Sequence, residues 1–248
     1  MKILFIFTQF LPNMGGTELP MYHYAKEIIK RGHEVIVFTA NSIRLKPANL
    51  NEKEIIDGII VRRFKFLPFP IYNQFFLSPS LISALLSLEV DIIQIFSWFP
   101  SFFILVPFFI AKMKRIPVIF YPQCHPFRCH FYPSLVKRIF GLFMDRLLGP
   151  HILKKADYII ALTDRESRFY KNKGIRNVEV IREPVQSVCY PSESELAKFR
   201  ANYNIGKEDK VLLTVCRITK YKGIHILIRS LATLLESIHN VKLLVVGE

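Results

Sequence analysis

The sequence is poor in cysteine and in acidic residues, and it lacks the repeats of fibrous proteins. Four cysteines in 248 residues are too few for a disulfide scaffold, which favours a reducing, cytoplasmic compartment. No collagen period, heptad repeat or low-complexity tract is present, which excludes fibrous and coiled-coil classes. Because Lys and Arg outnumber Asp and Glu by 34 to 20, the formal net charge is +14. This excess indicates an anionic partner: a nucleotide phosphate, a nucleic acid or an acidic lipid.

Signals for export and for membrane insertion are weak. The apolar run Ile3–Phe7 is too short for the core of a signal peptide and is typical of a buried strand. The uncharged run Ile92–Ala111 is long enough to cross a bilayer, but Gln94, Ser97 and Pro100 interrupt it. A strand, a turn and a buried helix explain the same residues, so we expect no transmembrane helix.

Apolar runs of strand length alternate with amphipathic segments along residues 1–185. Lys2–Phe7 is expected to be a strand, Thr17–Arg31 a helix that Gly32 ends, and His33–Thr39 a second strand, which together make a parallel βαβ unit. Further strands are expected at Ile59–Phe64, Val90–Phe96, Pro117–Tyr121, Tyr158–Thr163 and Val178–Ile181, and further helices at Ser80–Leu88, Phe102–Met113, Ser134–Lys155 and Glu166–Lys173. The pattern predicts an α/β domain with a doubly wound parallel sheet.

Residues 186–248 begin a second domain. The polar segment Gln186–Asp209 is a linker with a helix of its own at Glu193–Tyr203. A βαβ unit follows, with strands at Val211–Cys216 and Val241–Val246 around a helix at Gly223–Ser237. Because one such unit cannot cover both faces of its sheet, the sequence predicts an incomplete second Rossmann-like domain.

A glycine pair stands between the first strand and the first helix. Gly15 and Gly16 end the loop Thr8–Gly16 and bring main-chain N–H groups without Cβ atoms to the positive end of a helix dipole. The spacing matches neither a Walker loop nor the three-glycine dinucleotide fingerprint. The pair is a candidate anion site, and a tight turn without a ligand is the alternative.

Two cations follow the first strand of the second domain. Arg217 offers a planar fork and Lys222 a point charge, and both stand between a strand and the helix after Gly223. This placement suits a diphosphate. Ordinary solvated loop charge is the alternative interpretation.

Together these segments resemble glycosyltransferase family 4, retaining enzymes of the GT-B fold that use nucleotide-activated sugars. The likeness runs from Gly15-Gly16-Thr17-Glu18 to Gly32-His33-Glu34-Val35, and continues in Ala156–Thr163 and Arg217–Gly223. Cys216 stands where the family usually has glycine. The resemblance covers essentially the whole chain and implies a GT-B-like architecture, with residues 1–185 as the acceptor-side domain and residues 186–248 as part of the donor-binding domain.

The resemblance also implies roles for single residues. Arg217 and Lys222 would bind the donor diphosphate and stabilise the charge that develops on it as the sugar bond breaks. Gly15 and Gly16 would line the same cleft from the other domain. No metal ion and no cofactor are implied, since the two cations supply the positive charge.

His125 follows a predicted strand, at a place where family members carry histidines near the acceptor and the transferred sugar. Related sequences often have two histidines in this loop, and Gln123 takes the place of the first. His125 is therefore a candidate catalytic residue, and a loop histidine without a role is the alternative.

Two departures from the family bear on activity. The hinge motif, usually Pro-Asn-Gly-Val-Asp, reads Arg182-Glu183-Pro184-Val185-Gln186 here. The pair of glutamates that holds the sugar and the ribose in relatives falls beyond Glu248. We therefore expect a truncated donor domain and an inactive 248-residue polypeptide.

The sequence thus predicts transfer of a sugar from a nucleotide-sugar donor to a lipid-linked or glycan acceptor with retention. One rival is a non-catalytic remnant or interaction subunit of the same fold. Another is a basic nucleic-acid-binding protein, although no nucleic-acid-binding signature accompanies the charge, so we expect no nucleic acid as partner.

Two further features stay open. The basic stretch Lys112–Lys155 carries apolar residues and suits peripheral contact with an anionic membrane on its cytoplasmic face, or else is a core helix with a solvated side. Cys124, His125, Cys129 and His130 match no common zinc spacing, so free thiols are expected there.

Overall fold

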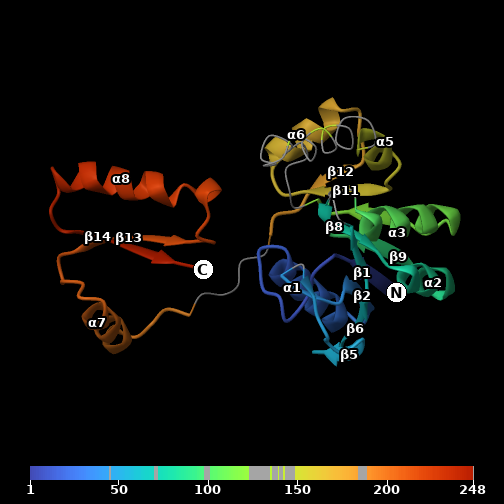
Figure 1. Cartoon of the computed structure of the whole chain (residues 1–248), viewed down its shortest axis with the longest axis horizontal. Coiled ribbons are helices and arrows are strands. Elements are labelled where there is room, and N and C mark those ends of the chain that lie inside the picture. Colours follow the sequence, from blue (N-terminus) through green and yellow to red (C-terminus); the bar gives the residue numbers. More distant parts are fainter. Residues whose placement is uncertain are drawn as a thin grey trace. The chain divides into compact units, whose positions relative to one another are not determined.

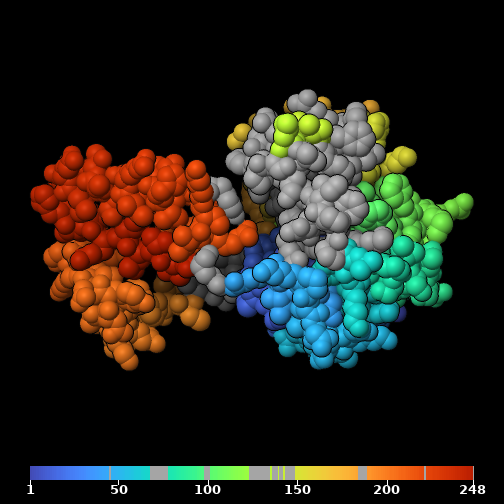
Figure 2. All heavy atoms as spheres, viewed as in Figure 1, coloured from blue at the N-terminus to red at the C-terminus, as the bar shows by residue number. Residues whose placement is uncertain are grey.

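The chain folds into two compact units in the computed structural model, Met1–Val185 and Gln186–Glu248 (Figure 1). The structure describes residues 1–44, 46–69, 72–97, 101–122, 149–183 and 189–247, and single residues at 135, 139 and 142. For residues 68, 69, 72–77 and 221 it describes the backbone alone. Figure 2 shows the heavy atoms of both units, coloured along the sequence.

The first unit is built on an eight-stranded sheet in the order β12-β11-β10-β9-β1-β2-β6-β5. The strands are β1 (Lys2–Ile6), β2 (Glu34–Ala40), β5 (Lys53–Ile56), β6 (Ile59–Phe64), β9 (Ile92–Ile95), β10 (Val118–Phe120), β11 (Tyr158–Ala161) and β12 (Val178–Val180). All neighbours pair in parallel except β5, which is antiparallel to β6. The predicted α/β class with a parallel sheet is confirmed.

The chain order changes direction between β1 and β9. From β1 the chain continues to β2 and β6 on one side, and it returns to β9 and then β10 to β12 on the other. In open parallel sheets, ligands bind outside the carboxyl ends of the strands at such a switch point. The loop at residues 7–17 leaves the carboxyl end of β1 at this place.

Helices cover both faces of the sheet (Figure 1). They are α1 (Glu18–Lys30), α2 (Pro79–Ser87), α3 (Phe102–Met113), α5 (Gly149–Lys154) and α6 (Asp164–Asn172). Ile3 and Phe5 of β1 belong to the apolar cluster that includes residues of α1, whereas Leu4 and Ile6 belong to the cluster that includes residues of the other four helices. Because successive side chains of a strand point to opposite faces, this two-sided cover explains the continuous apolar run in β1.

Helix α1 lies inside the predicted range and ends as expected. Gly32 follows it with a φ of +81°, a left-handed conformation that glycine adopts without strain. Thr17 takes the N-cap position, but its side chain makes no capping hydrogen bond.

The segment long enough to cross a bilayer folds as separate elements. Residues Ile92–Ile95 form β9, and α3 begins only at Phe102 and has 12 residues. Within the described ranges, every helix is too short or too polar to traverse a membrane.

Three hairpins were not predicted. β5 pairs with β6 across the turn at Asp57 and Gly58, β3 (Ser42–Ile43) pairs with β4 (Lys46–Pro47), and β7 (Leu67–Phe69) pairs with β8 (Tyr72–Leu77). Of the predicted helix Ser134–Lys155, the structure describes residues 135, 139 and 142 and α5.

The second unit contains the expected βαβ arrangement. Its elements are α7 (Glu193–Asn202), β13 (Lys210–Val215), a 3-10 turn at Lys220–Lys222, α8 (Ile224–Leu235) and β14 (Val241–Val246). β13 and β14 are parallel from Lys210–Val241 to Val215–Val246. Apolar side chains stay exposed on both sides of this unit, with Leu213 at 62% and Ile226 at 59%. As expected for a single βαβ unit, much apolar surface is uncovered.

Candidate functional site

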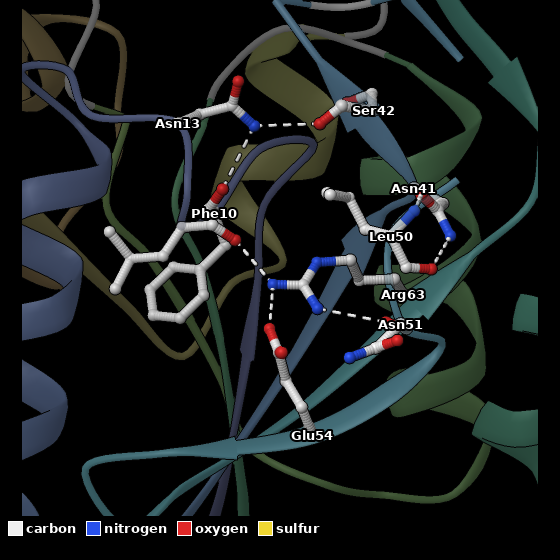
Figure 3. A network of polar contacts seen from close by, with 9 residues as sticks. Phe10, Asn13, Asn41, Ser42, Leu50, Asn51, Glu54 and Arg63 are labelled. Carbon is white, nitrogen blue, oxygen red and sulfur yellow. Dashed lines mark hydrogen bonds and ion pairs between the residues drawn. The ribbon is translucent and has the colours of Figure 1, made fainter. Parts of the chain in front are cut away.

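The loop between β1 and α1 is tied to the segment that follows β2 (Figure 3). The side-chain amide of Asn13 donates to the carbonyl oxygens of Phe10 at 3.1 Å and Ser42 at 2.9 Å. Its carbonyl Oδ1 accepts a hydrogen bond from the main-chain N–H of Arg44 at 2.9 Å. One side chain therefore fixes two loops at the carboxyl edge of the sheet.

A second tie comes from a buried arginine on β6. Arg63 is 4% exposed, and its Nη2 donates to the carbonyl oxygen of Leu11 at 2.6 Å (Figure 3). Nη1 donates to the carbonyl oxygen of Asn51 at 3.0 Å, and the guanidinium also forms an ion pair with Glu54 of β5. The loop is thus held at Leu11 and at Asn13, on either side of Pro12.

Neither of the two glycines of this loop has a left-handed φ. They differ in what surrounds them. A Cβ on Gly15 would come within 2.6 Å of Oε2 of Glu18. A Cβ on Gly16 would meet no described atom within 4 Å. A Cβ on Gly15 would therefore require the Glu18 side chain to shift, whereas none of the described residues stands in the way of a Cβ on Gly16.

Glu18 is the residue of this loop region that sequence reasoning passed over. It stands in the first turn of α1 and is only 7% exposed. A carboxylate at this place is stabilised by the positive end of the helix dipole. The sequence could have indicated Glu18, because it stands three residues after Gly15 in the segment Gly15-Gly16-Thr17-Glu18 that resembles the family.

A group of polar side chains lies beyond the carboxyl ends of β10 and β12. Tyr121 is fully buried, and its hydroxyl donates to Oε1 of Glu183 at 3.3 Å. Tyr24 of α1 donates from its hydroxyl to the carbonyl oxygen of Arg182 at 3.4 Å. The start of the predicted hinge is therefore bonded to α1 and to the end of β10.

Burial is the main cause of the pKa shifts of Glu183 and Tyr24. Partial burial raises the pKa of the Glu183 carboxyl, the hydrogen bond from Tyr121 offsets part of the rise, and the charge of Glu166 adds to it. Burial also raises the pKa of the Tyr24 hydroxyl. Glu183 thus stands out as a carboxyl that holds its proton more firmly than usual.

His125 falls outside the described residues, as do Cys124, Cys129 and His130 of the zinc alternative. The structure describes this loop only as far as Pro122, two residues after β10 ends. In the described part of the chain, no three His, Cys, Asp or Glu residues are grouped so as to hold a metal ion.

Arg217 and Lys222 lie in one short connection of the second unit. Both are exposed, Arg217 shortly after β13 and Lys222 at the end of the 3-10 turn that precedes Gly223. The main-chain N–H of Lys222 donates to the carbonyl oxygen of Thr219 at 3.0 Å, and that of Thr219 donates to the carbonyl oxygen of Arg217 at 2.9 Å. Both cations therefore lie in the short connection that leads from β13 to the N-terminus of α8.

The start of this connection is fixed by close main-chain packing. The N–H of Cys216 donates to the carbonyl oxygen of Val246 at 3.0 Å. A Cβ on Gly247 would lie 1.8 Å from the carbonyl oxygen of Cys216, so only glycine fits there. The end of β14 thereby supports the turn that carries Arg217.

Both parts of the chain match known protein families. A model of Glycosyltransferase Family 4 matches residues 14–208, and a model of Glycosyl transferases group 1 matches residues 196–248. The first match includes Gly15, Gly16 and Glu18, and the second includes Arg217 and Lys222.

Two curated proteins are similar to the chain. An uncharacterised glycosyltransferase of Methanocaldococcus jannaschii is 26% identical over 268 residues, which cover 100% of this chain and 63% of the relative. A UDP-N-acetylglucosamine–N-acetylmuramyl-(pentapeptide) pyrophosphoryl-undecaprenol N-acetylglucosamine transferase of Rickettsia felis is 26% identical over 186 residues, 73% of this chain and 45% of the relative. The chain therefore spans less than two thirds of the length of either protein.

The fold is shared with a solved structure. Sucrose-phosphate synthase of Thermosynechococcus elongatus superposes with a TM-score of 0.65 at 17% identity, covering 99% of this chain and 62% of the other. The similarity supports the predicted GT-B-like fold class.

Proposed function

We propose a sugar-transfer function from one premise: the chain belongs to Glycosyltransferase Family 4. The proposed reaction moves a sugar from a nucleotide-sugar donor to a hydroxyl of a lipid-linked or glycan acceptor, with retention at the anomeric carbon. The observation that carries the proposal is the connection between β13 and α8, which places Arg217 and Lys222 in the residues that precede a helix N-terminus.

In this reaction the bond between the anomeric carbon and the donor diphosphate breaks, and a bond from that carbon to the acceptor oxygen forms. The acceptor proton passes to the departing phosphate oxygen on the same face of the sugar, so no covalent nucleophile is needed. Arg217 would pair with two phosphate oxygens through its planar fork, and Lys222 would add a point charge. Cations fixed where charge develops stabilise the transition state more than the ground state.

The first unit would bind the acceptor. Gly16 offers an open main-chain position at the switch point of the sheet, which suits close approach of an anionic group. His125 is proposed to lie near the acceptor and the transferred sugar. No metal is required in this scheme, because Arg217 and Lys222 carry the compensating charge.

Peripheral contact with an anionic membrane is part of the proposal. Within the basic stretch Lys112–Lys155, Leu135 is 72% exposed and Ile139 is 59% exposed. Apolar side chains beside lysines and arginines favour the surface of an anionic bilayer. The name of the Rickettsia felis relative includes a pyrophosphoryl-undecaprenol acceptor, which supports a lipid-linked acceptor for this chain as well.

We further propose that residues 1–248 alone do not turn over sugar nucleotides. The chain spans 63% of the Methanocaldococcus jannaschii relative, and apolar side chains of β13 and α8 remain exposed. A non-catalytic interaction subunit is the rival function that fits the same observations.

Thermal-shift screening of the full-length natural protein against sugar nucleotides tests the proposal. Selective binding stabilises the native state, so the melting temperature rises with the cognate donor. Lys222→Ala is expected to abolish the shift, whereas Lys220→Ala, an exposed lysine of the same turn, keeps it. Equal shifts in both variants, or no shift with any sugar nucleotide, would contradict the proposed donor site.

A further inference from the structure

A buried guanidinium in the first unit has no part in the chemistry proposed above. Arg63 stands on β6, and its side chain is 2% exposed. Burial of an ion pair is costly unless the geometry is good, and an apolar pair of similar volume is often as stable. The position of Arg63 therefore needs an explanation beyond stability.

The partners of Arg63 come from two separate segments, residues 51–54 and the loop that contains Leu11. Glu54 on the adjacent strand compensates the charge, and the Asn51 carbonyl oxygen lies close by in sequence. The third partner is the Leu11 carbonyl oxygen, 52 residues away in the loop that leaves β1. The hydrogen bond to Leu11 therefore contributes most directly to the position of that loop.

The tethered residues lead directly to Gly16. The N–H of Asn13 donates to the Phe10 carbonyl oxygen at 3.1 Å, so residues 10–13 form a closed turn. Helix α1 follows, and at its start the N–H of Leu19 donates to the Gly15 carbonyl oxygen at 3.2 Å. Gly16 lies between the turn at residues 10–13 and helix α1. Its position therefore depends on the contacts that hold this turn and on the start of the helix.

We propose that Arg63 is a positioning residue, which holds the Leu11 carbonyl group so that the main chain at Gly16 meets the bound anion in one fixed geometry. Arg63 itself does not touch the substrate. The inference rests on the proposed function in so far as Gly16 contacts the ligand. Displacements of about 1 Å from changes distant from the chemistry can lower a rate roughly 100-fold, so a tether of this kind matters for catalysis.

The test compares four variants of the full-length protein. The double variant Arg63→Met/Glu54→Leu removes the donor to Leu11 and both charges, so no buried charge is left unpaired. Glu54→Gln keeps the hydrogen bond to Leu11. Arg62→Ala changes the neighbouring residue of the same strand, whose guanidinium stacks on Phe38 and Phe64.

Amide hydrogen exchange of peptides covering residues 8–17, measured without substrate, reports on the loop itself. We expect exchange to become at least about tenfold faster in the double variant and to stay unchanged in the two controls. Sugar transfer is expected to lose roughly 10- to 100-fold in kcat/KM, mostly in kcat, because positioning acts on the transition state. Arg63→Lys, which keeps one donor, is expected to recover part of the rate.

Four results would overturn the inference. The first three are unchanged loop exchange in the double variant, equally faster exchange in Arg62→Ala, and a faster-exchanging loop with an unaltered rate of sugar transfer. The fourth is a change in loop exchange no larger than the loss of global stability, which urea unfolding measures. If the wild-type protein transfers no sugar, the proposed function fails, whereas the exchange data still decide whether Arg63 holds the loop.

Discussion

The carboxylate of Glu18 occupies the space that a side chain at position 15 would need, since a Cβ on Gly15 would come within 2.6 Å of Oε2 of Glu18. This contact concerns one glycine of the pair, whereas a Cβ on the other would meet no described atom within 4 Å. The two positions are adjacent, yet they are expected to respond differently to the same substitution.

Gly15→Ala is expected to destabilise the protein. The added methyl group displaces the buried carboxylate of Glu18 from the first turn of α1, which costs about 1 kcal/mol when a buried polar group loses its partners. Urea unfolding measures the loss. Gly15→Ala/Glu18→Ala is the control, because removing the carboxylate also removes the clash. An unchanged free energy of unfolding in Gly15→Ala would show that Glu18 moves aside without cost.

Gly16→Ala is expected to leave the fold intact and to weaken ligand binding. No described atom lies within 4 Å of the added methyl group and φ is not left-handed, so the substitution gains about 0.4–1 kcal/mol from the lower entropy of the unfolded chain. The methyl group would stand where a ligand approaches. Isothermal titration with the sugar nucleotide selected by the thermal-shift screen is expected to show at least about tenfold weaker binding. Unaltered affinity would argue that Gly16 only shapes the turn.

Much of the fold was predictable because local patterns and tertiary packing agree. The continuous apolar run at Ile3–Phe7 predicts a strand with both faces covered, and Gly32 marks the end of α1. β5 was missed because Lys53 and Glu54 make its sequence look like a solvated loop. The turn at Asp57 and Gly58, with both φ values positive, was the available signal for a hairpin.

The site was less predictable than the fold. Glycines and cations in the connections that follow strands, such as Gly16 and Lys222, can be named as candidates from the sequence, and their role stays a prediction. The bond from Arg63 to Leu11 joins residues 52 positions apart and depends on the strand order, in which β6 lies beyond β2. A sequence contains no local pattern for such a contact.

Asp157 is expected to make the first unit sensitive to acid. Its Oδ2 accepts hydrogen bonds from Lys112 of α3 at 2.6 Å and from the main-chain N–H of Val118 at 2.7 Å. Burial alone would raise the pKa of this carboxyl, but the bonds from Lys112 and Val118 outweigh it and lower the pKa. The carboxylate therefore stabilises the fold above its unfolded-state pKa, near 3.9, and this contribution is lost as the pH falls through the lower folded-state value.

Asp157→Asn tests how much the bonds from Lys112 and Val118 to Asp157 stabilise the fold. At pH 7 we expect a loss of about 1 kcal/mol in the free energy of unfolding, kept modest because 43% of the Asp157 side chain is exposed. Asp164→Asn is the control, since Asp164 is 71% exposed and its pair with Arg182 is long, at 3.5 Å. Urea unfolding between pH 3 and 7 should show the difference between wild type and Asp157→Asn shrinking below about pH 4. A constant difference across this range would contradict the assignment.

The effect of Glu183 on the free energy of unfolding is expected to have the opposite sign to that of Asp157. Burial raises the pKa of its carboxyl, so the folded protein holds this proton more tightly than the unfolded chain does. The resulting penalty is absent below the ordinary pKa of a glutamate and is fully present above the raised folded-state value. Glu183→Gln removes the charge and keeps an oxygen that can accept the hydrogen bond from Tyr121. We expect a gain in the free energy of unfolding of at most about 1 kcal/mol at pH 7.5, because the group is only partly buried.

The pH dependence separates this effect from a change in packing at Glu183. The gain in Glu183→Gln is expected to become small by about pH 4, where the wild-type carboxyl is mostly protonated in both states. Glu179→Gln, an exposed position on β12, is the matched control and is expected to change the free energy of unfolding by less than about 0.5 kcal/mol at either pH. A gain in Glu183→Gln that persists at pH 4 would mean that the amide packs better than the acid. A loss at pH 7.5 would mean that the charge at the start of the hinge stabilises the fold, because the Glu183 carboxylate finds compensation that burial does not cancel.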